Sequence, residues 1–296
     1  MTLAESLSLY AILDYMPQKV TRLSATKIST FEQCAKYYEF QYVHRAKRSF
    51  TPIEWEVGSI VHDIIARLFR QIRDKQRGTI PKLGNAEWYR PLLADATSNL
   101  RNQVDEGIVR IVRPDERMQS YEEQMDNALG TFTAKALPLL HDHKIVGVEA
   151  DLGRFNLDGI QIDGRLDLIT QSGGNLYVHD WKTGGRRDED ARQAKIYYFA
   201  SKDKYRQPAT TFTLYYLAEA GDIVTSYTFS QEQRALLSAE IADIAARINA
   251  LETYQARVSV LCHWCPYGPQ CDEGNAYMSA HPPPVKKDQI DLGLVT

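Results

Sequence analysis

Three residues of one short stretch have the types and spacing that metal-dependent chemistry needs. Asp167 and Asp180 are acidic, and Lys182 follows Asp180 by two positions. Residues two apart on a β-strand project from the same face, so an ammonium lies beside a carboxylate if this stretch is extended. Two carboxylates on one patch repel each other unless a cation or substrate completes the site. Carboxylate oxygens favour Mg²⁺ or Mn²⁺.

The segments around these residues predict a β-hairpin that brings the two acids together. Leu166–Thr170 and Leu176–Trp181 are rich in branched and aromatic residues, as strands are. The residues between them, 172–175, read Ser-Gly-Gly-Asn, which is typical of a tight turn. We therefore expect Asp167 and Asp180 to lie close together on neighbouring strands.

A predicted helix over residues 188–200 follows the hairpin. Gln193 and Tyr197 are four positions apart and share one face of it. An amide and a phenol on one face suit a contact to phosphate or base.

The ordered set Gly-x-x-Asp, Asp-x-Lys and Gln-x-x-x-Tyr resembles the core of the PD-(D/E)XK nucleases, in the RecB-like branch. Asp-x-Lys by itself is more often a solvated ion pair at a strand end, so the order of the motifs carries the resemblance. It implies a mixed α/β, restriction-endonuclease-like core. It also implies catalytic roles for Asp167, Asp180, Lys182, Gln193 and Tyr197.

The resemblance further implies a set of metal ligands. Gly58-x-x-x-His62 matches the first motif of the family, although a lone histidine in an apolar helix is usually a core residue. The backbone carbonyl of Trp181 is implied as a ligand beside Asp167 and Asp180. Glu149 lies in a predicted strand over residues 144–155 and is interpreted equally well as an additional acid near the metal or as a strand-edge charge.

The four cysteines form a second candidate site. Cys262, Cys265 and Cys271 give the pattern Cys-x₂-Cys-x₅-Cys, and Cys34 is the remaining cysteine. Four clustered thiols indicate a tetrathiolate metal site, which binds zinc or an iron–sulfur cluster. Zinc ribbons usually have paired Cys-x₂-Cys motifs.

The N-terminal cysteine supports the iron–sulfur alternative. The pattern Ser-x-x-x-Ile-x-x-Phe-x-x-Cys that ends at Cys34 resembles the opening of the AddB and RecB nuclease domains. With the C-terminal spacing, it is also similar to the CRISPR-adaptation nucleases, and it implies a [4Fe–4S] cluster. Ala35 stands where that family usually has proline.

Composition limits the possible classes of protein. The chain has 296 residues, 44% of them hydrophobic, which suffices for a sizeable core, and its net charge is −3. Bulk charge therefore gives no support for nucleic-acid binding, and phosphate contacts must come from local basic patches such as residues 44–48. No apolar run reaches membrane length and the N-terminus lacks the features of a signal peptide, so we expect a cytoplasmic protein without disulfides.

The predicted organisation is one nuclease domain over residues 23–280, preceded by an extension (1–22) and followed by a flexible tail (281–296). Ser24–His44 is predicted as one helix. Residues 75–140 form a predicted helical insert, interpreted equally well as a guide for DNA or as a structural cover.

The predicted function is metal-dependent cleavage of DNA, as an exonuclease on single strands or DNA ends in recombination or repair. The alternatives are a non-catalytic DNA-end-binding subunit and a site-specific endonuclease. The chain lacks a P-loop, so a helicase or recombination partner is possible. Residues Gln289–Leu294 resemble peptides that bind the sliding clamp, although a last strand or disorder is the more common meaning of such a segment.

Overall fold

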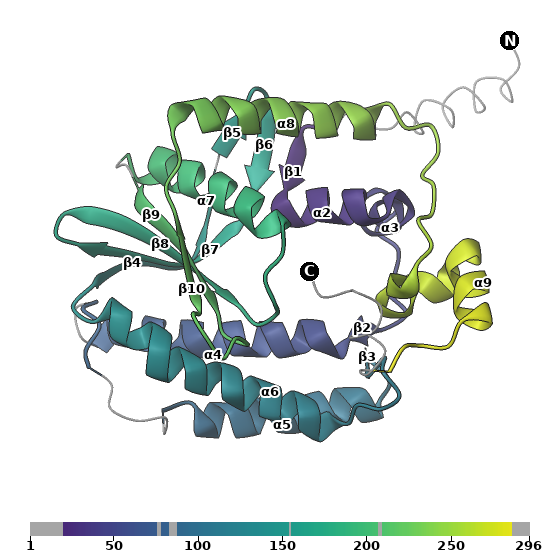
Figure 1. Cartoon of the computed structure of the whole chain (residues 1–296), viewed down its shortest axis with the longest axis horizontal. Coiled ribbons are helices and arrows are strands. Elements are labelled where there is room, and N and C mark those ends of the chain that lie inside the picture. Colours follow the sequence, from purple (N-terminus) through teal and green to yellow (C-terminus); the bar gives the residue numbers. More distant parts are fainter. Residues whose placement is uncertain (1–19, 76–77, 83–87, 154, 207–208, 286–296) are drawn as a thin grey trace, which may run out of the picture.

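A five-stranded sheet forms the centre of the molecule (Figure 1). The computed structural model describes residues 20–75, 78–82, 88–153, 155–206 and 209–285. The strands are β4 (Lys144–Asp151), β7 (Arg165–Ser172), β8 (Asn175–Lys182), β9 (Ala209–Tyr216) and β10 (Val224–Tyr227). Their order is β10-β9-β8-β7-β4, with β8 and β9 parallel and the other pairs antiparallel. The sheet and its helices make a mixed α/β fold, as the sequence predicts.

The hairpin β7–β8 is present where the sequence predicts it. Gly173 and Gly174 have φ angles of +55° and +82°, a conformation that glycine adopts without strain. Leu168 pairs with His179 in this antiparallel ladder. One further step in the same register places Asp167 opposite Asp180.

One face of the sheet is covered by α2 (Ala25–Gln33), α7 (Glu189–Tyr205) and α8 (Gln231–Asn249) (Figure 1). Ser230 begins α8 with a capping box that Gln233 completes, and the helix ends at Asn249.

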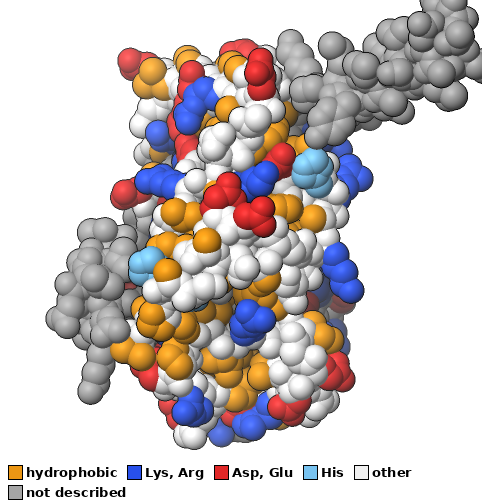
Figure 2. Space-filling view, turned by 90° about the vertical axis from the view of Figure 1, so that its right-hand side faces the viewer, with side chains coloured by type: hydrophobic (Ala, Val, Ile, Leu, Met, Phe, Trp, Pro, Cys, Tyr) orange, Lys and Arg blue, Asp and Glu red, His pale blue; other side chains and the backbone are white. Residues whose placement is uncertain are grey.

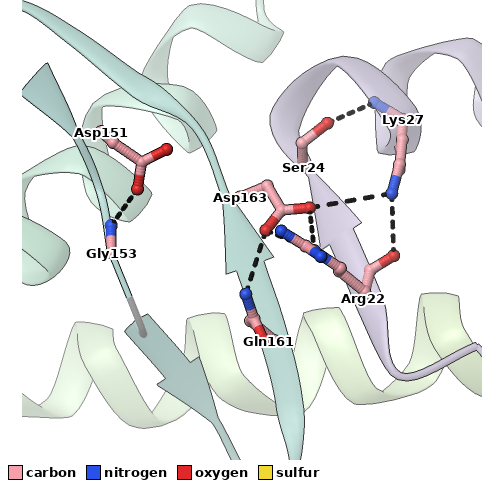
Figure 3. Close-up of polar contacts among 7 residues, drawn as sticks. All are labelled: Arg22, Ser24, Lys27, Asp151, Gly153, Gln161 and Asp163. Carbon is pink, nitrogen blue, oxygen red and sulfur yellow. Dashed lines mark hydrogen bonds and ion pairs between the residues drawn. The ribbon is translucent and has the colours of Figure 1, made fainter.

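A small sheet of β1 (Arg22–Ser24), β6 (Ile160–Asp163) and β5 (Phe155–Leu157) lies on the same side. Asp163 pairs with Arg22 at 2.6 Å, and the Ser24 hydroxyl accepts a hydrogen bond from the backbone N–H of Lys27 (Figure 3). These contacts fix the start of α2 next to the chain that enters β7.

The opposite face is covered by α4 (Ile53–Lys75), α5 (Arg90–Asp105) and α6 (Met118–Thr131), with a π-helical turn η3 (Phe132–Ala136) and a 3₁₀ turn η4 (Leu137–Leu140). Trp181 packs here against Phe69, Phe132 and Tyr215. The predicted insert is therefore largely helical. It also contains the short strand β3 (Val109–Arg110), which pairs in parallel with β2 (Thr51–Pro52).

The prediction of one helix over Ser24–His44 is wrong. Cys34 has extended backbone angles (φ −163°, ψ 113°) and ends α2, after which α3 (Ala35–Tyr38) and a π-helical turn η1 (Glu39–Val43) follow. The backbone N–H of Lys36 donates to the carbonyl of Gln255, so the chain here turns toward the C-terminal region. That long-range contact outweighs the local helical pattern.

The C-terminal region forms a small lobe of short elements, which we call the cysteine lobe (residues 260–280). It comprises η5 (Val260–Trp264), η6 (Gly268–Gln270) and α9 (Asp272–Ala280) (Figure 1). None of the helices in the described ranges is both long and apolar enough to span a membrane. The first 19 residues and the clamp-like segment Gln289–Leu294 lie outside the described residues.

Candidate active site and cysteine site

Asp167 is the central residue of the candidate active site. Its side chain is 10% exposed, and its Oδ2 accepts a hydrogen bond from the backbone N–H of Trp181 at 2.9 Å. The carboxylate is thus fixed across the hairpin by the strand that carries Asp180. The Trp181 side chain itself lies in the core, 2% exposed.

His62 reaches the same place from α4. Its Nδ1 lies 3.2 Å from Oδ2 of Asp167. Val61 and Ile65 flank His62 on the helix and are buried in the core, and the imidazole reaches Asp167 from this packed helix. The histidine is therefore beside an acid, and is not the satisfied core residue that a lone histidine usually is.

Glu149 completes a group of three potential ligands. One potential ligand atom each from His62, Glu149 and Asp167 lies within 4.8 Å of the other two. Val148 pairs with Leu168 and Ala150 with Leu166, so Glu149 faces Asp167 across the β4–β7 ladder. Its φ of +49° is a left-handed conformation that costs a non-glycine residue roughly 1–2 kcal/mol. Such strain is typical of functional sites, because the surrounding fold must enforce it.

Asp180 and Lys182 form a second pair at this edge. Lys182 Nζ lies 2.8 Å from Asp180 Oδ2, and the two side chains are 20% and 5% exposed. The geometry of this ion pair leaves Oδ2 without a hydrogen-bond donor among the described residues. Asp180 is not part of the close group of three, although the sequence resemblance pairs it with Asp167 as a ligand.

The protonation equilibria of these groups reflect burial and mutual charge. Burial above all raises the pKa of Asp180, Lys182 lowers it, and Asp167 raises it further. Burial acts to raise the pKa of Asp167 as well, but His62, the Trp181 N–H and Lys182 together lower it. Burial alone would lower the pKa of His62, but Asp167 raises it to about 9. The site therefore concentrates negative charge, which His62, Lys182 and, at Glu149, Arg165 offset in part.

Gln193 contacts Lys182, and Tyr197 contacts Gln193. Lys182 Nζ donates a hydrogen bond to Oε1 of Gln193. Tyr197 is 8% exposed, and a hydrogen bond to Gln193 acts to lower its pKa, which burial raises to about 12. The pair thus contacts the lysine, where the sequence alone suggests contact with a nucleic acid.

One supporting residue has no signal in the sequence analysis. Asp190 is buried and accepts hydrogen bonds from the Tyr216 hydroxyl at 2.9 Å and from the backbone N–H of Arg187 at 3.0 Å. It also raises the pKa of Lys182, after Asp180. Asp190 lies in the first turn of α7, after the loop that follows Lys182, and only this position in the chain places it near the lysine.

The four cysteines line a single cavity of about 40 Å³, together with aromatic residues and two glycines. Cys34, Cys262, Cys265 and Cys271 thus come together from both ends of the chain. In this described part of the chain, no three of the sulfurs all lie within 4.8 Å of one another. A single tetrahedral zinc ion would hold its thiolates only ~3.8 Å apart, given a Zn–S distance of ~2.3 Å.

Backbone N–H groups contact three of these sulfurs. Arg257 donates to Cys34 Sγ at 3.4 Å. Burial raises the pKa of Cys265 to about 11, while a hydrogen bond from the Tyr267 backbone acts to lower it. Burial likewise raises the pKa of Cys271 against the backbone of Gly274. These donors favour the thiolate, the form that binds metal.

The cysteine lobe contacts the helix of the candidate active site directly. The indole N–H of Trp264, between Cys262 and Cys265, donates to Glu54 Oε1 at 2.9 Å. Glu54 is in the first turn of α4, the helix that carries His62. The two sites are therefore mechanically connected through one helix.

Comparison with known proteins decides the family. The family model of the PD-(D/E)XK nuclease superfamily matches residues 22–272. The chain belongs to this superfamily. Metal-dependent cleavage of nucleic-acid phosphodiester bonds is the activity class of the superfamily, and the close group of His62, Glu149 and Asp167 could hold a metal ion of the kind that such cleavage uses.

Other comparisons add little to the superfamily assignment. A solved structure described as SSO0001 is 12% identical and covers 91% of this chain and 94% of its own, with a TM-score of 0.34, which is too low to carry an argument. No curated protein matches the sequence.

Proposed function

We propose that this superfamily member is a metal-dependent deoxyribonuclease that acts as an exonuclease on single strands or DNA ends. The observation that carries the proposal is the convergence of His62, Glu149 and Asp167 beside the Asp180–Lys182 pair. Imidazole and carboxylate donors fit a divalent cation such as Mg²⁺ or Mn²⁺.

The metal would be held by His62, Glu149 and Asp167, with Asp180 and the Trp181 carbonyl as further ligands. When bound, it supplies Lewis acidity that offsets charge on the phosphodiester. Protein carboxylates alone would repel a phosphate, so the charge balance of this site supports a cation there.

Lys182 is the residue that we assign to charge stabilisation and to orienting the attacking water. Asp180 raises its pKa against the effect of burial, so the ammonium stays charged at neutral pH. A fixed ammonium beside the substrate stabilises negative charge that develops on phosphate oxygens. Gln193 accepts a hydrogen bond from Lys182, and Tyr197 is hydrogen-bonded to Gln193. We therefore assign these two residues to positioning Lys182.

The preference for single strands or DNA ends rests on the order of the motifs, which resembles that of the RecB-like branch. A helicase or recombination protein is the expected partner in that setting. Recombination, repair and other DNA-end processing are the pathways that fit. The alternatives remain a non-catalytic end-binding subunit and a site-specific endonuclease.

Cleavage of matched substrates tests the proposal. Labelled linear and circular single-stranded DNA of one sequence, and a linear duplex, are incubated with Mg²⁺ or Mn²⁺, with EDTA and Asp167→Asn as controls. An exonuclease degrades the linear strand and spares the circle. Cutting of the circle indicates an endonuclease, and binding without cleavage indicates a non-catalytic subunit.

We also propose that the four cysteines hold a [4Fe–4S] cluster. Each thiolate of such a cluster binds a different iron, so the sulfurs stand further apart than around one ion. The four cysteines line one cavity, and the pattern that ends at Cys34 resembles that of cluster-binding nuclease domains; together these support the cluster over zinc.

Metal analysis of anaerobically purified protein separates the two alternatives. We expect brown protein with iron and sulfide near four each per chain. Stoichiometric zinc without sulfide would contradict the cluster and leave the nuclease proposal standing.

A further inference from the structure

Trp55 differs from the other tryptophans of the chain. The chain has four tryptophans, all of them described. Trp181 packs among aromatic rings, and Trp88 and Trp264 donate hydrogen bonds from their indoles. The Trp55 ring is 40% exposed, and among the described residues it contacts no other aromatic ring. Hydrophobic burial therefore does not explain its position.

Arg48 is the residue that accompanies this ring. Its guanidinium carbon lies 5.4 Å from the ring centroid of Trp55. Arg45, Lys47, Arg48 and Arg110 are all exposed, and no described carboxylate forms an ion pair with any of them. Arg45, Lys47 and Arg48 of the basic segment 44–48 are therefore free to meet an anion, whereas His44 lies 3.3 Å from Glu39.

The same face of α4 connects Trp55 with the metal site. Trp55, Ser59 and His62 are spaced by four and three residues and lie on one stripe of the helix. Seven residues span ~10 Å along a helix. A DNA strand that has one phosphate at the metal site therefore reaches Trp55 within a few nucleotides.

The molecular surface on this side of the protein mixes basic, acidic and hydrophobic side chains (Figure 2). Figure 2 views the side on which the N-terminal end of α4 and the cysteine lobe lie in Figure 1. Lys and Arg side chains stand among hydrophobic ones on the lower half of this face. Phe50, close by in sequence, is buried under the guanidinium of Arg110 at 4.0 Å. The patch thus combines an open aromatic ring with positive charge.

We propose that Trp55 and Arg48 form a base-stacking site for single-stranded DNA at the approach to the metal site. This inference rests on the proposed function and names its substrate subsite. A nucleobase stacks on the indole face, and Arg48 contacts the adjoining backbone or the edge of the stack. Bases paired within a duplex do not expose their faces, so the site favours single strands.

Binding is measured without cleavage, with EDTA present, to a labelled oligothymidylate and to a blunt duplex. Trp55→Ala should bind the single strand about tenfold more weakly, which corresponds to about 1.4 kcal/mol. Trp55→Phe keeps a ring and should stay within about threefold of the wild type. Leu236→Ala is the matched control, because Leu236 is an exposed hydrophobic residue on α8. Arg48→Lys should lose part of the effect while its charge is kept.

Tryptophan fluorescence gives a second readout. Stacking on Trp55 should quench the emission of the wild type, and this quench should disappear in Trp55→Phe while binding persists. An oligonucleotide with abasic sites should bind without the quench. Unchanged affinity of Trp55→Ala, or an equal quench in Trp55→Phe, would overturn the stacking site.

The outcomes also separate this inference from the nuclease proposal. Stacking without cleavage under any metal condition would leave the subsite and remove the catalytic assignment. Cleavage together with normal DNA binding by Trp55→Ala would leave the catalytic assignment and remove the stacking site. If Trp55→Ala alters only the oligomeric state in sedimentation, the ring is an interface between copies and the subsite is wrong.

Discussion

The metal site and the cysteine site both join distant parts of the chain, but different forces hold them in place. The acidic residues sit on sheet strands whose neighbours are buried, and His62 sits on a helix packed against the same core. The cysteine lobe consists of two short 3₁₀ turns and the nine-residue helix α9, which lie beside the cavity that the cysteines line. The metal site is therefore supported by the fold without its ion. The proposed cluster would supply much of the support for the cysteine site.

The charges of the two sites support the same distinction. Asp167 has His62 as a partner and Asp180 has Lys182, so charge is partly balanced before metal binds. Burial raises the pKa of Cys265 and Cys271, so free thiols there stay protonated at neutral pH. A metal bound there, as proposed, would have to displace those protons, which would couple its binding to the order of the lobe.

The largest expected effect is loss of cleavage in Asp167→Asn, Asp180→Asn and Lys182→Ala. Each change removes a metal ligand or a charge-stabilising group, so the cleavage rate should fall by at least about 10²–10³-fold. DNA binding and the melting temperature should change little. Asp95→Asn, at an exposed position of α5, is the control. Near-normal rates in any of the three variants would contradict the assignment.

The next effect is loss of stability in Cys34→Ser. A cluster bound by Cys34 and Cys262 closes a loop of more than two hundred residues, worth about 5 kcal/mol by the loop-entropy relation for disulfides. Colour, iron content and the free energy of unfolding should fall together. If Cys34→Ser melts like Asp167→Asn, the contrast between the sites disappears.

A smaller effect is expected for the contact that joins the two sites. Trp264→Phe removes the hydrogen bond to Glu54, whose Oε2 is already buried without a hydrogen-bond partner among the described residues. The cost should be about 1.5–3 kcal/mol, with faster release of iron to a chelator. Trp88→Phe is the matched control, because it removes a similar indole hydrogen bond to Thr133 in the insert. Equal rates of iron release in both variants would contradict a connection between the two sites through Trp264 and Glu54.

Removal of the divalent ion should have a smaller effect still. At ten times its dissociation constant, an ion stabilises the fold by about 1.4 kcal/mol. EDTA should therefore lower the melting temperature by about 2–5 °C. Collapse of the fold in EDTA would show that the metal site is as dependent on its ligand as the cysteine site.

The smallest effect concerns pH and a histidine of the sheet scaffold. Burial lowers the pKa of His143, which hydrogen-bonds Thr170 at 2.9 Å. The unfolded chain then binds more protons once the pH falls below about 6.5, so stability is lost on acidification, by at most ~1.4 kcal/mol per pH unit. Urea titrations at about pH 7.5 and 5.5 should show a larger loss for wild type than for His143→Asn. An equal loss in both proteins would contradict this origin.

The sequence alone determined the elements whose patterns are local. The hairpin β7–β8 has alternating strands joined by Ser-Gly-Gly-Asn, and Ser230 with Gln233 specifies the start of α8. Asp-x-Lys on a strand fixed which face Asp180 and Lys182 share. The superfamily was accessible in the same way, because the order of its motifs is a property of the chain.

The tertiary structure alone decided what depends on distant contacts. Cys34 interrupts a segment that is helical by pattern, because its sulfur and the backbone N–H of Lys36 contact residues more than two hundred positions away. The sequence fits Glu149 equally well as an acid near the metal or as a strand-edge charge. Only the β4–β7 register, with a strained backbone at Glu149, directs its side chain toward Asp167. Gln193 shares a helix face with Tyr197 in either case, but its amide oxygen meets Lys182 only because α7 packs beside β8. Periodicity records which side of an element is buried; it does not record which partner covers that side, and in this protein the partner decides what the residue does.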